Sequence, residues 1–130
     1  MKTSASVKYA FLATSYIAQH GSKGLVIADA ISEHCGIPKA YLPRTTQALL
    51  RMNILHSKRG IKGGFSLGRP LNKITMLDLI EAIEGPMDVS LALEENAPKD
   101  KFAAKMTAAY DKVTRQTRAA LAKIKLSDLM

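Results

Sequence analysis

The chain has 130 residues, 47% of them hydrophobic, with 19 Lys and Arg against 11 Asp and Glu. This apolar share excludes an intrinsically disordered chain, and no apolar run approaches the roughly 18 residues of a membrane-spanning helix. The first residues lack the pattern of a secretory signal peptide. A single cysteine excludes an internal disulfide and a cysteine-based zinc site. Together these features predict a small, soluble, cytoplasmic protein without a membrane partner.

The net charge of +8 is unevenly distributed along the chain. Residues 1–75 hold 11 basic and 2 acidic side chains, a balance of +9, whereas residues 76–130 hold 8 basic and 9 acidic ones, a balance of −1. A basic half joined to a neutral half predicts a polyanion-binding head followed by an element for assembly or sensing. The alternative, a basic surface that only maintains solubility, would scatter the charge.

Apolar residues at spacings of three and four predict three helices in the first half of the chain. The first spans about residues 4–20 and ends at Gly21. The next two span about residues 28–35 and 38–52, with a tight turn at Gly36 between them. Two short helices separated by such a turn have the spacing of a helix-turn-helix.

Beyond residue 53 the pattern changes to that of a β-hairpin. Residues 54–58 and 64–68 contain β-branched and aromatic residues and are predicted to form two short strands, joined by a glycine-rich loop. Lys58, Arg59 and Lys62 surround the tip of this hairpin. The predicted fold class is therefore mainly α with a small β-hairpin wing, in which a winged helix-turn-helix head precedes a long C-terminal helix.

The second half of the chain contains two more predicted helices. Thr75 and Asp78 have the spacing of a capping box that opens a helix to about Glu84. After an aperiodic stretch, the longest helical pattern covers about residues 100–124. Its apolar stripe comprises Phe102, Met106, Tyr110, Val113, Leu121 and Ile124. A small head cannot cover this stripe, so we expect homodimerisation through it. Packing against the chain's own first helix is the alternative.

These elements divide the chain into three parts. Residues 1–86 form the predicted winged helix-turn-helix domain, 87–99 a loop, and 100–130 a dimerisation helix with its tail. No feature indicates an enzyme, because the chain lacks a phosphate-binding loop that opens a helix, a nucleophile elbow and a Cys-His or paired-carboxylate constellation.

Several short motifs occur together at fixed distances. They are Tyr9-Ala10, Gly36-Ile37-Pro38, Tyr41-Leu42, the run Ser57 to Leu67 with its Arg-Gly and Gly-Gly-Phe steps, Arg69-Pro70, Ile74-Thr75 and Glu84-Gly85-Pro86. In this combination the chain resembles, over about residues 4–86, the IscR/NsrR/CymR type of bacterial winged-helix regulators. Residues 126–129 resemble the segment that closes the dimerisation helix of that family. The resemblance implies a homodimeric transcription factor, most often a repressor, that binds double-stranded DNA at a two-fold-related operator.

The winged-helix arrangement identifies candidate DNA contacts. The start of the third helix would enter the major groove, and the wing would reach phosphates or the adjacent minor groove. The candidates are Ser4, Lys8, Lys39, Tyr41, Arg44, Gln47, Lys58, Arg59, Gly60 and Lys62. For Tyr41, packing against the first helix is as well supported by the sequence as a DNA contact.

Pro43 departs from the family pattern, in which a polar residue is common at this position. Proline is tolerated within the first helical turn but not in a helix interior. We therefore expect the regular helix to begin near Ala40, or to kink there. The side chain of Pro43 cannot hydrogen-bond a base, so the operators of the family do not transfer to this chain.

Many regulators of this type hold an iron–sulfur cluster through three cysteines in the loop before the long helix. Residues 87–105 contain no cysteine, and no cofactor is predicted for the chain as written. Ala92, Ala97 and Ala103 stand five and six residues apart, much like those cysteines. One interpretation is an ordinary alanine-rich stretch. The other is a Cys-to-Ala form of a cluster-binding regulator, whose native form would hold a two-iron cluster.

Two further alternatives concern the signal. A regulator without a cluster could respond to a partner protein, as an interaction module, or to a small molecule in a pocket lined by Met76, Met87 and Met106. Cys35, near the end of the second helix, is predicted to be a buried structural thiol.

Overall fold

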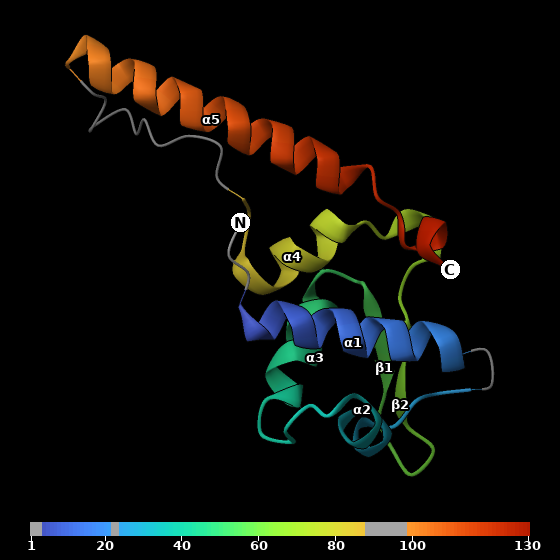
Figure 1. The fold of residues 1–130 in the computed structure, drawn as a ribbon. Coiled ribbons are helices and arrows are strands. Elements are labelled where there is room, and N and C mark those ends of the chain that lie inside the picture. The colour runs from blue at the N-terminus through green and yellow to red at the C-terminus, as the bar shows by residue number, and fades with distance from the viewer. Residues whose placement is uncertain (1–3, 22–23, 88–98) are drawn as a thin grey trace.

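The computed structural model describes residues 4–21, 24–87 and 99–130. It shows a helical head with a β-hairpin, and a long C-terminal helix whose first half projects away from the head (Figure 1). In chain order the elements are α1 (Ala5–His20), α2 (Ala28–Cys35), α3 (Leu42–Arg51), β1 (Leu55–Lys58), β2 (Gly64–Leu67), the 3-10 helix η2 (Leu71–Lys73), α4 (Met76–Glu84), α5 (Lys101–Ala122) and the 3-10 helix η4 (Leu126–Leu129).

The core of the head forms around α1. Val7, Ala10, Thr14 and Ile17 lie at spacings of three and four and are almost completely buried. This face of α1 packs against α2, α3, α4 and β2. The fully buried core side chains from these and neighbouring segments include Ile31, Leu49, Ile54, Ile74 and Leu79. Removing each such side chain from water contributes roughly 1.5–3 kcal/mol, and this burial holds the surface elements in place.

The predicted helix-turn-helix is present, with one difference at the start of α3. Gly36 ends α2 in a left-handed conformation, φ 66°, and its N–H donates to the Ser32 carbonyl. The α-helix α3 then begins at Leu42, later than the predicted start near residue 38 or Ala40. Pro43 therefore lies in the first turn, where a missing N–H removes no helical hydrogen bond. No kink is needed.

The hairpin pairs β1 with β2 in antiparallel register, from Leu55 opposite Leu67 to Lys58 opposite Gly64. Val26 joins the open side of β2 through two backbone hydrogen bonds with Phe65, at 2.9 and 2.8 Å. Gly64, beside this bridge, has φ 152°, and a Cβ at this position would lie 2.7 Å from the Val26 carbonyl oxygen. The base of the wing therefore requires glycine here.

The predicted capping box at the start of α4 is confirmed. The Asp78 backbone N–H donates to Thr75 Oγ1 at 3.1 Å, and the Thr75 N–H donates to Asp78 Oδ2 at 3.0 Å. Arg69 adds an ion pair to the same carboxylate at 3.3 Å. Two donors, the Thr75 N–H and the Arg69 guanidinium, thus converge on the Asp78 carboxylate, and together with the bond from the Asp78 N–H to Thr75 they fix the direction in which α4 leaves the hairpin.

The C-terminal end of α5 is attached to the head. Arg118 pairs with Glu81 of α4 at 3.1 Å. Beyond the helix, the chain returns to form a bridge with the segment before α4, in which the Met76 N–H donates to Ile124 and the Leu126 N–H donates to Ile74, both at 2.9 Å. The helix α5 packs against α4. None of the described helices is long and apolar enough to cross a membrane.

Candidate nucleic-acid interface

The face of α3 that is turned away from the core carries exposed polar side chains, whereas the opposite face is buried. Leu42, Thr45 and Leu49 point into the head, whereas Arg44 and Gln47 are exposed one turn apart. Within the described part of the chain, neither Arg44 nor Gln47 has a side-chain hydrogen bond or an ion pair. A guanidinium and an amide presented in this way match the groups that read guanine and adenine edges in the major groove.

Two further candidates lie in the turn before α3. Lys39 is 3.8 Å from Asp29, but both side chains are about 70% exposed, so this ion pair is weak and easily exchanged for a phosphate contact. The Tyr41 ring lies 6.3 Å from that of Tyr9 in α1, yet Tyr41 is 58% exposed. Tyr41 thus lies beside Tyr9 of the first helix while more than half of its surface stays exposed, so both interpretations made from the sequence remain compatible with its position.

The wing presents an exposed basic tip. Lys58, Arg59, Gly60 and Lys62 are all exposed, and Gly60 turns the chain with φ 114°. Between the cations lies Ile61, whose side chain is completely exposed. Sequence reasoning did not single out Ile61, although an apolar residue between cations at a hairpin tip was visible in the sequence. Apolar side chains at such tips can contact the sugar walls of a minor groove.

The start of α3 and the tip of the wing lie at the same end of the head, opposite α5 (Figure 1). A groove between them is lined by Thr46 of α3 and by Ser57 to Gly60 of the wing. We call the exposed residues Arg44 and Gln47 of α3, together with Lys58, Arg59 and Lys62 of the wing, the basic end.

Ser4 and Lys8 lie at the start of α1, separate from the wing tip. The Ser4 backbone N–H donates to Glu84 Oε1 at 3.4 Å. This N–H is therefore not free to bind a phosphate, which differs from the role that the sequence predicts for Ser4. Lys8 is exposed. Of the two candidates, Lys8 retains the geometry of a phosphate contact.

The stripe on α5 divides into two parts. Phe102, Met106, Tyr110 and Val113 are between 57% and 71% exposed, which is unusual for four large apolar side chains on one helix face. Leu121 is half-buried and Ile124 is 37% exposed. The exposed stripe, meaning these first four residues, thus occupies the half of α5 that projects away from the head.

The described residues do not fit a cysteine-ligated iron–sulfur cluster. Ala92 and Ala97 lie outside the described residues, and Ala103, in the first turn of α5, has only a methyl group to offer. Cys35 is half-buried at the end of α2, and its thiol donates to the Leu12 carbonyl at 3.5 Å. No group of three metal-ligating side chains occurs among the residues that the structure describes. We therefore derive no function through a cluster.

Cys35 is expected to react slowly with thiol reagents in the folded protein. Desolvation by burial raises the pKa of its thiol, which lowers the thiolate fraction at neutral pH. Labelling with a disulfide reagent at pH 7.5 should be about tenfold slower than in urea-unfolded protein. Equal rates in both states would show that Cys35 is accessible and would contradict the packing described above.

Three helices, a tight turn between α2 and α3, and a hairpin with a basic tip define a winged helix-turn-helix protein. Comparison with known proteins is more specific. The model of the Rrf2 family, described as an iron-dependent transcriptional regulator, matches residues 3–130. The chain therefore belongs to the Rrf2 family.

Relatives and solved structures agree with this assignment. The regulator IscR of Xenorhabdus nematophila is 31% identical over 90 residues, which make up 69% of this chain and 55% of that protein. The structure of T. potens IscR superposes with a TM-score of 0.77 at 26% identity, over 99% of this chain and 85% of that one. The global cysteine regulator CymR of B. subtilis, at 22% identity, shares the fold with a TM-score of 0.78, over 99% and 95% of the two chains. The chain spans about half the length of the curated relatives it matches.

Proposed function

We propose that the chain is a sequence-specific DNA-binding transcriptional regulator, and that it acts in the cytoplasm as a homodimeric repressor. The observation that carries this proposal is the pairing of two surfaces. The exposed Arg44 and Gln47 share the basic end with the wing cations, whereas the exposed stripe on α5 lies at the opposite end of the molecule. The basic end is chemically complementary to the phosphates of duplex DNA, and the exposed stripe is complementary to an apolar partner surface.

In the proposed complex, α3 enters the major groove with its first turns. Arg44 and Gln47 contact base edges, Lys39 and Tyr41 contact the flanking backbone, and Pro43 offers only apolar contact to a base. Thymine methyl groups are the base-edge feature that an apolar residue can recognise. Pro43 therefore favours a thymine, where a polar residue would select a hydrogen-bonding group.

The wing extends this contact beyond the major groove. Lys58, Arg59 and Lys62 reach phosphates or the neighbouring minor groove, and Gly60 allows close backbone approach. Lys8 adds a phosphate contact from α1. A two-fold dimer built on α5 would present two such surfaces to half-sites separated by about one helical turn, roughly 34 Å.

The signal that controls the regulator is proposed to be a partner protein or a small molecule. This alternative is favoured because residues 87–105, which include the loop before α5, contain no cysteine. A form with cysteines at positions 92, 97 and 103 would hold a two-iron cluster instead. Sequencing the natural gene distinguishes the two, since alanine codons at all three positions would end the Cys-to-Ala interpretation.

Selection of binding sites from random duplex DNA tests the proposed function directly. The expected result is a two-fold-symmetric consensus whose half-sites are about one helical turn apart. Recovery of random sequences, or of an asymmetric single site, would contradict the proposal of a homodimeric sequence-specific regulator.

Arg59→Ala is expected to weaken binding to all DNA sequences by a similar factor. Loss of one phosphate contact should also reduce the slope of log affinity against log salt concentration by about one. Fluorescence anisotropy over a salt series measures both effects. The matched control is Lys73→Ala, which removes an exposed cation from η2, on the part of the head that packs against η4. It should leave the slope unchanged. An unaltered slope for Arg59→Ala would refute the proposed wing contact.

A further inference from the structure

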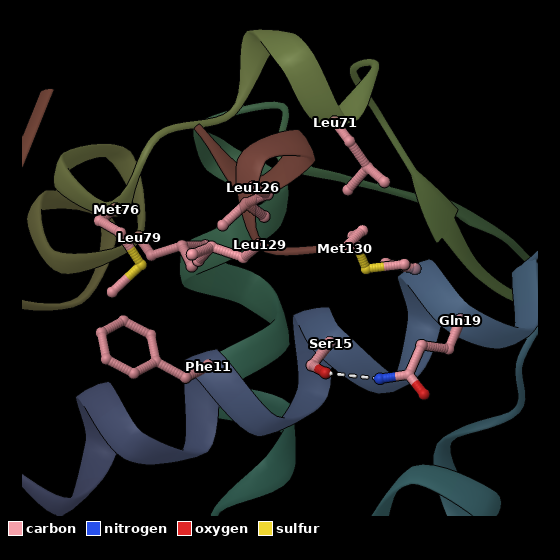
Figure 2. A pocket seen from close by; sticks show the side chains of 10 residues that line it. Phe11, Ser15, Gln19, Leu71, Met76, Leu79, Leu126, Leu129 and Met130 are labelled. Atoms are coloured by element: carbon pink, nitrogen blue, oxygen red, sulfur yellow. Dashed lines mark hydrogen bonds between the residues drawn. The ribbon is translucent and has the colours of Figure 1, made fainter. Parts of the chain in front are cut away.

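A pocket of about 300 Å³ opens between three segments that are far apart in the sequence (Figure 2). Phe11 lies on the α1 wall, Met76 and Leu79 on the α4 wall, and Leu126 and Leu129 on the η4 wall. This volume is at the lower end of the roughly 300–1,000 Å³ typical of small-molecule sites. The pocket includes none of the candidate DNA contacts.

The pocket differs from the one expected from the sequence. Of the three methionines proposed as lining, only Met76 is part of its wall. Met106 belongs to the exposed stripe on α5, and Met87 is absent from the lining. The cavity is therefore built from the head and the C-terminal segment after α5.

The lining has no charged side chain and contains one polar pair. Gln19 Nε2 donates to Ser15 Oγ at 2.9 Å on the exposed side of α1, as Figure 2 shows. Neither side chain makes another hydrogen bond within the described residues, so the Ser15 hydroxyl proton, the Gln19 carbonyl and one Gln19 N–H remain available. A charged ligand would lose hydration here without meeting an oppositely charged side chain.

We propose that this pocket binds a small, neutral, amphipathic molecule. Its apolar body lies between Phe11, Leu79 and Leu129, and its hydroxyl or carbonyl group hydrogen-bonds to the Ser15–Gln19 pair. The apolar body supplies the binding energy through burial, and the polar pair at the rim sets the orientation.

The position of the pocket connects such a ligand to α5. The wall formed by η4 follows α5 after only three residues. The same wall is held to the segment before α4 by the backbone hydrogen bonds from Met76 to Ile124 and from Leu126 to Ile74. A ligand that separates η4 from α1 therefore changes the angle at which α5 leaves the head. This effect of the ligand on α5 rests on the proposed function, because we expect it to change the affinity of the dimer for DNA.

Methionine methyl resonances provide the test, because Met76 and Met130 line the pocket whereas Met52 and Met106 are exposed elsewhere. Titration of the free protein with para-butylphenol should shift the Met76 and Met130 signals saturably and leave those of Met52 and Met106 in place. The charged analogues para-butylbenzoate and para-butylbenzylammonium should cause no saturable shift. Equal shifts at all four methionines, or equal binding of the charged analogues, would overturn the proposal.

Two variants locate the site. Ala18→Phe places a ring in the cavity and should abolish the shifts, whereas Ala108→Phe, which adds the same ring to the exposed surface of α5, should preserve them. If the first variant does not fold, Gln19→Leu serves in its place. It should weaken para-butylphenol about fivefold without weakening butylbenzene, because only the hydrogen bond is lost. Shifts that persist in Ala18→Phe, or equal effects on both ligands in Gln19→Leu, would contradict the assignment.

The experiments distinguish a pocket that binds no ligand from a protein that lacks the proposed DNA-binding function. The methyl titration contains no DNA, so a protein that binds its operator without methyl shifts disproves only the pocket. Conversely, saturable shifts in a protein that binds no DNA would disprove the regulator. With both present, para-butylphenol should change operator affinity at least about threefold in the wild type and not in Ala18→Phe. An unchanged affinity would refute the coupling.

Discussion

Val113→Glu is expected to convert the protein to a monomer and to lower operator affinity at least about 100-fold. Val113 is 59% exposed and is the last residue of the exposed stripe, near the middle of α5. In a two-fold dimer each copy would bring one glutamate into the same apolar contact, and a buried charge without a partner costs about 3 kcal/mol or more. That energy corresponds to roughly two orders of magnitude in an equilibrium constant. Light scattering and anisotropy measure the two effects.

The matched control for this prediction is Ala108→Glu. Ala108 is exposed on the same helix but lies away from the exposed stripe, so the added charge stays in water. This variant should remain dimeric and bind the operator normally. If Val113→Glu remains dimeric, the exposed stripe is not the dimer contact. If both variants become monomers, the effect comes from added negative charge and not from the stripe.

Gly64→Ala is expected to destabilise the fold by about 3 kcal/mol. The backbone at Gly64 has φ 152°, and an added Cβ would lie 2.7 Å from the Val26 carbonyl oxygen and 2.9 Å from its carbon. Both obstacles are backbone atoms held by the hydrogen bonds between Val26 and Phe65, so they cannot move aside without breaking that bridge. Strained backbone of this kind costs roughly 1–3 kcal/mol, to which the steric overlap adds. Urea unfolding followed by circular dichroism gives the free energy of unfolding.

Gly21→Ala is the matched control for this substitution. Gly21 has helical dihedral angles, φ −66° and ψ −19°, and a Cβ there would meet no atom within 4 Å. The change should therefore leave the free energy of unfolding unchanged or raise it by up to about 1 kcal/mol, because alanine restricts the unfolded chain. Similar losses for the two variants would mean that the close approach at Val26 does not determine the stability of the wing.

Local sequence rules predicted the elements well where a single rule applied. Thr75 and Asp78 satisfy the capping box, and α4 begins where that motif places it. The start of α3 was predicted less well because two prolines, Pro38 and Pro43, both satisfy the rule for a first helical turn. In the structure the Pro38 carbonyl closes a separate turn, in which it accepts from the Tyr41 and Leu42 N–H groups, and Pro43 lies in the first turn of α3. The proline rule alone does not decide between the two positions.

Local patterns also predict only part of the candidate site, because some of its contacts join segments that are far apart in the sequence. Exposure of Arg44 and Gln47 follows from the amphipathic pattern of α3, and the position of Arg59 follows from the hairpin. The occupied N–H of Ser4 depends on Glu84, 80 residues further along the chain. The pocket likewise joins α1 to η4, over more than 100 residues. Contacts at such sequence separations depend on the packed fold, which no periodicity or motif records.

The attachment of α5 at its C-terminal end gives this helix the mechanics of a lever. Its 22 residues make it about 33 Å long. A tilt of about 10° at the attached end, near Arg118 and the segment that returns to Ile74, displaces the far end by about 6 Å. That displacement exceeds the base-pair rise of about 3.4 Å along a duplex. In the proposed dimer, a small rotation at the head would therefore be enough to shift one half by more than one base pair relative to the other.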